Sequence, residues 1–388
     1  MSAPEGRERR LAVARRRRLA LAGIALVATL AGAVAGSRVG GAEPEGARQA
    51  QAPSCPPDVA RDPQRLAGQM LVARMEATAT PELLRAVRRG EIGGVVLFPP
   101  TGTDPRALGR EVEKLGRAAR NAGAPAPLVS IDQEGGEVER LPSLPPDRTP
   151  SELAARGTEV LGAQARATGR ALSQLGINVD LAPVLDVPTS ADAAIASRSF
   201  ADRPAAVGDA GTAFITELQD QGVAATAKHF PGLGAAVTNT DLEPVSIDVN
   251  RAALNAGLEP FSDAIAAGVD VVMVANATYP VLDAERPASL SRKVIEGTLR
   301  KRLGYSGVVI TDDLGAGALT GAGYDEGETA TGAAAAGADL LLFALSDGSV
   351  ARAALVRALR SGELSRSALE ASCARNTALR ESLSSAPG

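Results

Sequence analysis

The chain reads Gly222-Val223-Ala224-Ala225-Thr226-Ala227-Lys228-His229-Phe230-Pro231-Gly232-Leu233-Gly234 near its middle. The first six residues carry no charge, and a short uncharged run of this kind is typical of a strand buried on both faces of a sheet. Lys228 and His229 end the run, and His229 is the only histidine of the protein. A buried strand that ends in polar side chains and a Pro-Gly turn predicts one unit of a parallel α/β sheet.

Other apolar runs occur along the chain, and helix-like stretches separate them. The predicted strands cover residues 69–75, 94–98, 127–131, 179–183, 223–228, 269–274, 307–311 and 339–343. The predicted helices cover residues 81–89, 105–122, 151–175, 204–220, 251–267, 291–303 and 349–361. Apolar strands that alternate with helices in this way indicate a parallel sheet that is buried on both faces.

The length of the chain decides how this sheet closes. In a protein of 388 residues, eight strands of this kind are expected to form a (β/α)8 barrel of the TIM type. A doubly wound open sheet is the alternative, but no G-x-G-x-x-G sequence follows the first strand. We therefore predict an α/β fold with one barrel domain over residues 62–385 and with helices at its C-terminal end.

The N-terminal residues differ in composition from the rest of the chain. Seven arginines fall within residues 7–18, and residues 19–36 contain no charged side chain. A basic segment, an apolar run and the triplet Ala33-Val34-Ala35 are typical of a secretion signal. The apolar run is also long enough to stay in the bilayer as an anchor, while the arginines disfavour a third interpretation, a buried core helix. We predict export, a signal peptide or membrane anchor over residues 1–36, and a flexible linker over residues 37–61.

Only two cysteines occur, Cys55 at the end of this linker and Cys373 near the C-terminus. In an exported protein two cysteines tend to pair, and two unrelated buried thiols are the alternative. A Cys55–Cys373 bridge would join the segment before the barrel to its last helix. It would close a very long loop, which the chain-entropy model values at roughly 3–5 kcal/mol.

Polar side chains follow the predicted strands at their carboxyl ends. They are Asp132 and Arg140 after the third strand, Asp186 and Arg198 after the fourth, Lys228 and His229 after the fifth, Asn276 after the sixth, and Asp312 and Asp313 after the seventh. Each residue alone would be interpreted as a structural carboxylate or a surface charge, but in a barrel all these positions meet at one mouth. Such a ring fits a ligand dense in hydroxyl groups, as a sugar is.

The composition excludes some partners. The net charge is −4, from 41 basic and 45 acidic side chains, so nothing indicates nucleic acid as a partner. Aromatic residues are scarce, with no Trp, three Tyr and six Phe, which favours a small terminal sugar over a long polysaccharide. One histidine and two distant cysteines cannot form a zinc site, and the carboxylates lack the spacing of a calcium loop. We expect neither a metal nor a cofactor.

Several motifs resemble those of family 3 glycoside hydrolases, in particular bacterial exo-β-N-acetylglucosaminidases, which are β-N-acetylhexosaminidases. The resemblance covers roughly residues 62–383. It rests on Lys228-His229-Phe230-Pro231-Gly232-Leu233-Gly234, Ile131-Asp132-Gln133-Glu134-Gly135-Gly136, Gly176-Ile177-Asn178-Val179-Asp180-Leu181-Ala182-Pro183-Val184, Ser197-Arg198-Ser199-Phe200 and Thr311-Asp312-Asp313-Leu314. It implies a single catalytic barrel that removes a terminal β-linked sugar, with N-acetylglucosamine of cell-wall fragments as the expected substrate.

The resemblance also implies roles for individual residues. Asp312 would be the nucleophile of a retaining mechanism, in which a carboxylate attacks the anomeric carbon and a second group protonates the leaving oxygen. The sugar-binding residues would be Asp132, Arg140, Arg198, Lys228 and His229. We expect the cations Arg140, Arg198 and Lys228 to keep Asp312 ionised through their positive potential. We expect Asp313 to cap the helix that follows.

The chain departs from the family pattern at the proton-transfer loop. The family's D-[ST]-H sequence, whose Asp and His transfer the proton together, aligns with Asn239 and Asp241. Leu233 replaces the histidine of the P-G-H-G turn, and Glu137 replaces the arginine of E-G-G-R. Because His229 is assigned to binding, Asp241 is the candidate acid/base; a carboxyl group in a closed, apolar pocket can take this role. Loss of general acid help typically costs roughly 10²–10⁴-fold in rate.

Two hypotheses about function follow. The first is a working exo-glycosidase with Asp312 as nucleophile and Asp241 as acid/base. The second is a catalytically degenerate barrel that binds a cell-wall sugar or a partner without efficient hydrolysis. Under both hypotheses we expect a monomer that binds a small saccharide or cell-wall fragment and meets a membrane only through residues 1–36.

Overall fold

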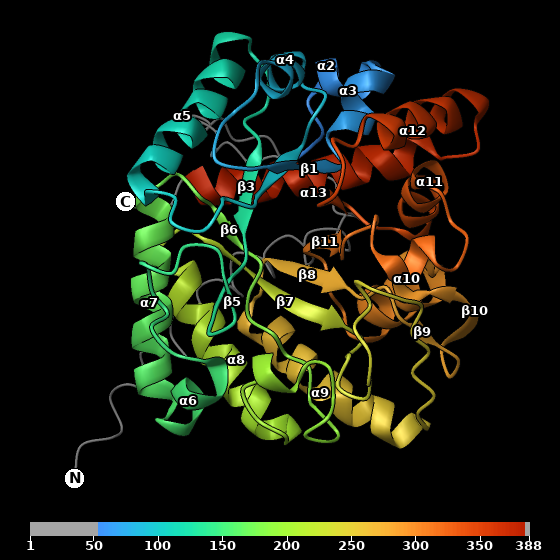
Figure 1. Ribbon diagram of the computed structural model, residues 1–388. Coiled ribbons are helices and arrows are strands. Elements are labelled where there is room, and N and C mark those ends of the chain that lie inside the picture. The colour runs from blue at the N-terminus through green and yellow to red at the C-terminus, as the bar shows by residue number, and fades with distance from the viewer. Residues whose placement is uncertain (1–52, 385–388) are drawn as a thin grey trace, which may run out of the picture. The chain divides into compact units, whose positions relative to one another are not determined.

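The computed structural model describes residues 53–384, and a sheet of eight parallel strands lies at its centre (Figure 1). The strands are β1 (Leu71–Met75), β2 (Gly94–Leu97), β3 (Leu128–Ile131), β6 (Val179–Asp180), β7 (Ala224–Phe230), β8 (Val271–Val274), β11 (Val308–Thr311) and β12 (Leu341–Phe343). From β1 to β11 each strand pairs with the next one along the chain, and β12 pairs with β1. A parallel bridge between Ile310 and Leu340 brings the two edges of the sheet together. The predicted (β/α)8 barrel is confirmed.

A helix follows each barrel strand. These helices are α4 (Pro81–Arg89), α5 (Pro105–Asn121), α7 (Thr158–Gln174), α8 (Pro204–Gln219), α9 (Arg251–Ala267), the π-helix η3 (Lys293–Arg302), α11 (Glu326–Ala336) and α12 (Ser349–Ser361). Thr80 caps α4 and Asn250 caps α9, since each side chain accepts a hydrogen bond from the first turn of its helix. Such caps are readable in sequence, and both helices have the bounds predicted for them.

Shorter elements complete the described part. They are α2 (Pro57–Arg61), α3 (Pro63–Gly68), β4 (Gln133–Gly135), β5 (Val138–Glu139), α6 (Pro150–Ala155), η1 (Ala196–Arg198), β9 (Thr278–Tyr279), β10 (Asp283–Pro287), η2 (Ala288–Leu290), α10 (Gly317–Thr320) and α13 (Arg366–Ser384). The strands β4 and β5 form one hairpin and β9 and β10 form another. All four strands lie in loops outside the barrel sheet.

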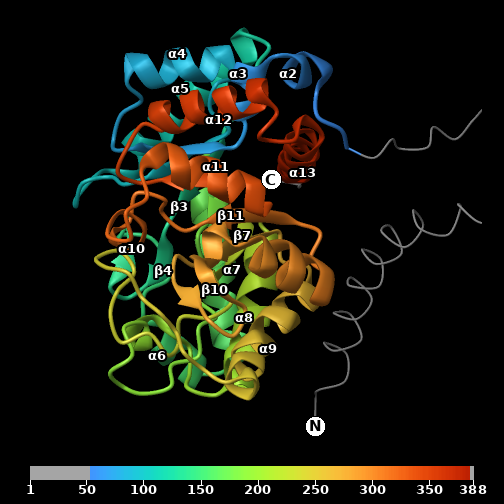
Figure 2. The same ribbon diagram turned by 90° about the vertical axis from the view of Figure 1, so that its right-hand side faces the viewer.

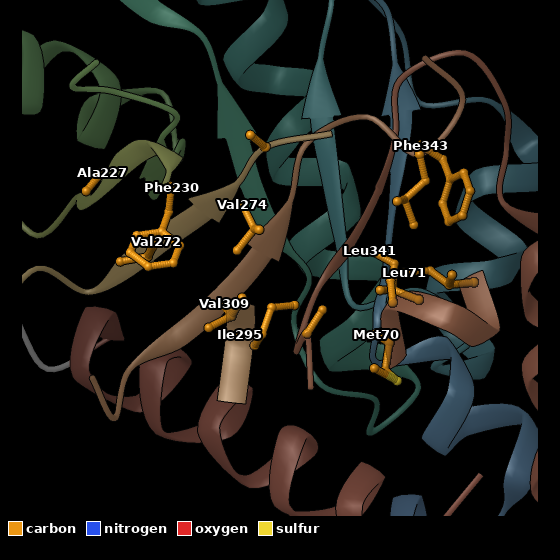
Figure 3. Close-up of a cluster of buried hydrophobic side chains, with 14 of the residues drawn as sticks. Met70, Leu71, Ala227, Phe230, Val272, Val274, Ile295, Val309, Leu341 and Phe343 are labelled. Atoms are coloured by element: carbon orange, nitrogen blue, oxygen red, sulfur yellow. The ribbon is translucent and has the colours of Figure 1, made fainter. Parts of the chain in front are cut away.

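Alternate strand residues face the barrel interior and the surrounding helices. Val72, Val96 and Leu128 belong to an interior cluster to which the barrel strands contribute. Their neighbours along the strands belong to a second cluster with the helices, where Val309 of β11 meets Ile295 of η3 (Figure 3). Because both faces of each strand are buried, the strands appear in the sequence as continuous apolar runs.

Helix α13 lies across the end of the barrel at which the strands begin. Asn376 donates its amide to the carbonyl oxygens of Gln69 and Asp339, at 3.3 and 3.0 Å. Arg380 donates to the carbonyl oxygen of Gly93 at 2.8 Å. Figure 2 shows α13 at one end of the barrel and α10 with the long loops at the other. The amino end is therefore covered by a helix, and the carboxyl end is left to loops.

Three expectations about element limits differ from the structure. The helix predicted over residues 151–175 is divided into α6 and α7 at Gly157, whose φ of 93° favours glycine and interrupts the helix. The end of the predicted linker, residues 57–61, forms α2, because the side chain of Val59 is fully buried against the core. Helix α11 was not predicted, although it begins at a capping box.

The predicted disulfide is present. Cys55 and Cys373 are bonded, with a Cα–Cα distance of 5.1 Å, and they are 318 residues apart in sequence. Nearby, Arg366 of α13 donates to the carbonyl oxygen of Ala60 in α2 at 2.6 Å. The bond and the hydrogen bond together attach the start of the barrel domain to its last helix.

The predicted signal peptide or anchor over residues 1–36 lies outside the described residues, as does the linker as far as residue 52. Within residues 53–384, none of the helices combines the length and the apolar character that crossing a membrane requires.

Removal of the disulfide is expected to lower the free energy of unfolding. In the double variant Cys55→Ser/Cys373→Ser the expected loss is about 3–5 kcal/mol, because the unfolded chain regains the entropy of a very long loop. Urea unfolding followed by circular dichroism measures this loss. Reductant should destabilise the wild type and leave the double variant unchanged. Equal stability of the oxidised wild type and the double variant would contradict the prediction.

Candidate active site

A cavity of about 630 Å³ opens at the carboxyl end of the barrel. All the residues predicted for catalysis or sugar binding line it, namely Asp132, Arg140, Arg198, Lys228, His229, Asp241 and Asp312. Asp313 lines it as well. Asp186 and Asn276, expected in the same ring, are buried behind the lining residues and bond to His229 and Asp313. Loops that are far apart in sequence therefore meet around one space.

Lys228 is the centre of a buried ion cluster at this cavity. Its Nζ lies 2.9 Å from Asp132 Oδ1 and 2.6 Å from Glu134 Oε1, and its side chain is 2% exposed. Arg198 binds the same Glu134 through two hydrogen bonds, Nε to Oε2 at 2.9 Å and Nη2 to Oε1 at 2.6 Å. Burial acts against each charge, but the mutual attraction is larger, so the pKa of Glu134 is lowered and the pKa of Lys228 is raised. The groups of this cluster therefore stay charged near neutral pH.

Glu134 was not among the predicted site residues. Its signal was nevertheless present, because β4 is extended and residues 132 and 134 therefore point to the same side of the chain. If the side chain of Asp132 lies in the site, the side chain of Glu134 lies there too, and its buried charge requires a cation nearby. Within the described residues, no group of three or more His, Cys, Asp or Glu side chains is arranged to hold a metal ion.

Asp132 contacts a second cation nearer the surface. Arg140 Nη2 lies 3.3 Å from Asp132 Oδ2, and its guanidinium stacks over the ring of Phe98 at 4.3 Å from the centroid. Burial alone would raise the pKa of Asp132, but the charges of Lys228 and Arg140 outweigh it and lower this pKa to about 2. Asp132 is therefore ionised and can only accept hydrogen bonds.

Asp186 fixes His229 and the loop that follows it. His229 Nδ1 lies 2.7 Å from Asp186 Oδ2, and the backbone N–H groups of His229 and Leu233 also donate to the Asp186 carboxylate. Because Nδ1 faces Asp186, Nε2 is the ring nitrogen that can meet a ligand. The loop then passes so close to Val187 that a Cβ at Gly234 would lie 1.7 Å from the Val187 carbonyl oxygen. Only glycine fits at residue 234.

Asp312 follows β11 directly and is held by backbone on both sides. Its N–H donates to the carbonyl oxygen of Val274 in β8 at 2.9 Å, and its Oδ1 accepts from the N–H of Asp313 at 2.8 Å. Asp313 does not cap α10 as expected. Its Oδ1 instead accepts from the N–H groups of Gly315 and Ala344, at 3.1 and 2.9 Å, so it joins this turn to the end of β12.

The electrostatic environment of Asp312 differs from the expectation. Burial raises its pKa, His229 lowers it and Asp241 raises it, and the net direction is upward. The cations were expected to lower this pKa; Lys228 does lower it, but its charge does not outweigh the burial of Asp312 and the charge of Asp241. The physical reason is that Arg140, Arg198 and Lys228 are already paired with Asp132 and Glu134.

Asp241 lies on the exposed loop after β7. Its N–H donates to Asn239 Oδ1 at 2.9 Å, and Asn239 Nδ2 donates back to Asp241 Oδ2 at 3.3 Å. The carbonyl oxygen of Asp241 accepts from the N–H of Gly317 at 2.9 Å, which attaches this loop to α10. Asn239 thus orients the carboxylate of Asp241, and the charge of Asp241 acts on Asp312 through the cavity.

Comparison with known proteins places this site in a family. The model of the glycosyl hydrolase family 3 N terminal domain matches residues 65–379. A relative from Arthroderma benhamiae, described as an uncharacterized secreted glycosyl hydrolase, is 36% identical over 340 residues, which are 84% of this chain and 96% of the relative.

Two solved structures are similar to the barrel. A family 3 β-N-acetylglucosaminidase from Paenibacillus sp. str. FPU-7 superposes with a TM-score of 0.80 at 34% identity, over 84% of this chain and 63% of that one. This chain thus spans less than two thirds of the Paenibacillus protein. A β-N-acetylhexosaminidase from Beutenbergia cavernae DSM 12333 superposes with a TM-score of 0.75 at 32% identity, over 82% of this chain and 97% of that one.

The environment of Asp313 predicts a pH dependence of stability. Burial raises the pKa of Asp313 from 3.8 to about 6. Well below pH 3.8, Asp313 is protonated in both the folded and the unfolded protein. Between pH 3.8 and about 6 it releases its proton in the unfolded protein but keeps it in the folded one, so the free energy of unfolding falls as the pH rises. Between pH 4 and pH 7 the wild type is expected to lose about 2 kcal/mol relative to Asp313→Asn.

The variant Asp313→Asn is a matched control because it keeps an oxygen that can accept from Gly315 and Ala344 and removes only the titration. Urea unfolding of both proteins across this pH range gives the two free energies. A difference between them that stays constant from pH 4 to pH 7 would contradict the assigned pKa.

Proposed function

This chain belongs to glycosyl hydrolase family 3, and we propose that it is an exported exo-glycosidase that releases a terminal β-linked N-acetylglucosamine. The observation that carries the proposal is the cavity itself, which Asp312 shares with Asp132, Arg198 and Lys228. The choice of sugar is supported by two similar solved structures, which are described as a β-N-acetylglucosaminidase and a β-N-acetylhexosaminidase. Cell-wall fragments are the proposed source of that sugar.

Export is supported by two further observations. The Cys55–Cys373 disulfide is typical of a protein that works in an oxidising compartment. The Arthroderma relative is described as secreted.

The proposed sugar site consists of charged groups of both signs. Asp132, with its low pKa, accepts hydrogen bonds from two sugar hydroxyls. Lys228, Arg140, Arg198 and His229 Nε2 donate to the ring substituents. A pyranose has hydroxyls that both donate and accept, so a wall with both kinds of group can satisfy it on several sides.

The proposed reaction proceeds in two steps. In the first, a carboxylate oxygen of Asp312 attacks C1, the bond from C1 to the aglycone oxygen breaks, and that oxygen takes a proton from Asp241. In the second, water attacks C1 and loses a proton to Asp241, and the ester bond to Asp312 breaks. The products are the free sugar with its anomeric configuration retained and the free aglycone.

A binding protein without efficient turnover is the second candidate. One observation favours a binding protein: Asp241 is exposed at the edge of the cavity, and its carboxylate is bonded to Asn239 instead of orienting a histidine. General acid catalysis requires a group that carries its proton at the working pH. If the loop does not close over a bound sugar, Asp241 meets water and the leaving oxygen receives little help.

Substitutions of the two aspartates separate these functions. Asp312→Ala is expected to reduce release of the phenol from 4-nitrophenyl N-acetyl-β-D-glucosaminide to the background rate, because a phenol leaves without an acid but not without a nucleophile. Asp241→Asn is expected to slow hydrolysis of N,N′-diacetylchitobiose by roughly 10²–10⁴-fold and to affect formation of the glycosyl-enzyme from the aryl glycoside much less.

Steady-state and pre-steady-state kinetics on both substrates measure these effects. If wild type and Asp312→Ala release phenol equally slowly, the protein is not a glycosidase of this kind. If Asp241→Asn leaves disaccharide hydrolysis unchanged, Asp241 is not the acid, and His229, held by Asp186, becomes the group to test.

Restoring the family's proton-transfer pair is expected to raise activity. In the double variant Asn239→Asp/Asp241→His the loop reads Asp-Thr-His, and an imidazole oriented by a carboxylate replaces a single carboxylate. We expect hydrolysis of the disaccharide to increase by about ten-fold or more, with a smaller change on the aryl substrate. Kcat/KM values for both substrates provide the test. Asn239→Asp alone is the control, and an equal gain in that variant would refute a role for the new histidine.

A further inference from the structure

Exposed aliphatic side chains gather around the mouth of the cavity. Among residues 53–384 the exposed large hydrophobic side chains are Val160, Val237, Leu242, Leu345 and Val350. Leu345 itself lines the cavity, and Val237 and Leu242 directly flank its lining residues 238–241. We call Val237, Leu242 and Leu345 the apolar rim. They are 74, 77 and 70% exposed.

The backbone fixes two members of the rim beside the same turn. A Cβ built at Gly317 would lie 2.2 Å from the carbonyl oxygen of Leu242, and one built at Gly315 would lie 3.5 Å from the Cβ of Leu345. Between these glycines, Ala316 lines the cavity. The loop after β7 and the loop after β12 therefore approach one turn from two directions, and each presents a leucine to solvent there.

The exposed apolar surface of the rim is suited to bind a ligand. Aliphatic side chains scattered singly over a surface are ordinary, but a group of them at the opening of a cavity marks a place where apolar surface is buried on binding. Phe98 extends the same opening, since it lines the cavity with one ring face under Arg140. The charged residues of the ion cluster, by contrast, are buried deeper in the site.

We propose that the apolar rim is the aglycone site and that it selects glycosides whose aglycone is an aryl group. This inference rests on the proposed function. A terminal sugar with C1 at Asp312 and its hydroxyls on Asp132 and Lys228 has its remaining group, the aglycone, directed to the open mouth. There the aglycone meets Leu345 and Leu242.

The loop that bears the rim supplies an independent reason for an aryl aglycone. Asp241, which precedes Leu242, takes the place of an Asp–His pair, so the protein has limited means of protonating a leaving oxygen. A phenolic oxygen departs with little protonation, whereas a sugar hydroxyl needs a proton as it leaves. A single carboxyl group in place of the family's pair and an apolar mouth therefore suit the same class of substrate.

Binding of non-hydrolysable ligands tests the rim without requiring turnover. The probes are two S-linked N-acetyl-β-D-glucosaminides, one with a 4-butylphenyl and one with a 4-(hydroxymethyl)phenyl aglycone, measured by titration calorimetry on the full chain. The wild type is expected to bind the butylphenyl ligand about ten-fold more tightly, because part of the butyl chain is buried. In Leu242→Ser/Leu345→Ser the ratio of the two Kd values should fall to near one. Val160→Ser, which removes an exposed valine on α7, is the matched control and should keep the ten-fold ratio.

Several results would overturn the proposal. These are equal Kd values in the wild type, an unchanged ratio in the double leucine variant, and no binding of either ligand. A double variant that changes only the oligomeric state, measured by light scattering, would make the rim a self-association surface and would also overturn it.

The O-linked counterparts of the two ligands test the proposed function separately. Hydrolysis of both at equal kcat/KM would support the proposed hydrolase activity and contradict the aglycone role of the apolar rim. The expected Kd ratio without any hydrolysis would support the apolar rim as a glycoside-binding surface and contradict the hydrolase activity.

Discussion

The ammonium group of Lys228 lies between the carboxylates of Asp132 and Glu134, and the geometry of the site depends on this contact. Removing an ion from water costs several kcal/mol, and only close opposite charges with good hydrogen bonds offset that cost. Lys228 comes from β7, its carboxylates come from the segment after β3, and Arg198 comes from η1. None of these charges could be buried alone, so the folded chain has to bring the three segments together.

The same pairing determines the environment of Asp312. Because the cations of the site are paired with Asp132 and Glu134, the charges of Lys228 and His229 do not offset the burial of Asp312 and the charge of Asp241, and the pKa of Asp312 is raised. A buried carboxylate whose charge is only partly compensated is stabilised when positive charge develops nearby. In the proposed reaction that charge appears at C1 of the sugar as the aglycone departs, so the stabilisation is larger in the transition state than in the resting site.

The barrel could be predicted from sequence because its signal is local. A strand buried on both faces has to be apolar throughout, and a helix that begins at Thr80 or Asn250 carries its cap in the sequence. The convergence of the site residues could also be anticipated, since the loops after parallel strands share one end of a barrel. The contacts between side chains of different loops were harder to predict. Glu134 and Asp186 have partners that are distant in sequence, so their roles and the direction of the Asp312 pKa shift depend on contacts that only the folded chain defines.

The loop after β7 carries both the candidate acid/base Asp241 and two exposed aliphatic side chains, and these features are consistent with one another. It carries no histidine beyond His229, and Asn239 and Asp241, which the motif resemblance aligns with the family's Asp–His pair, bond to each other. On either side of these residues, Val237 and Leu242 extend into solvent. With a sugar leaving group, as in a cell-wall fragment, a single carboxyl group would have to supply the proton and the aliphatic side chains would face a polar aglycone. With an aryl aglycone the side chains gain a partner, and the need to protonate the leaving oxygen is also reduced. The two features then describe one adaptation, in which recognition of the aglycone compensates for limited proton transfer.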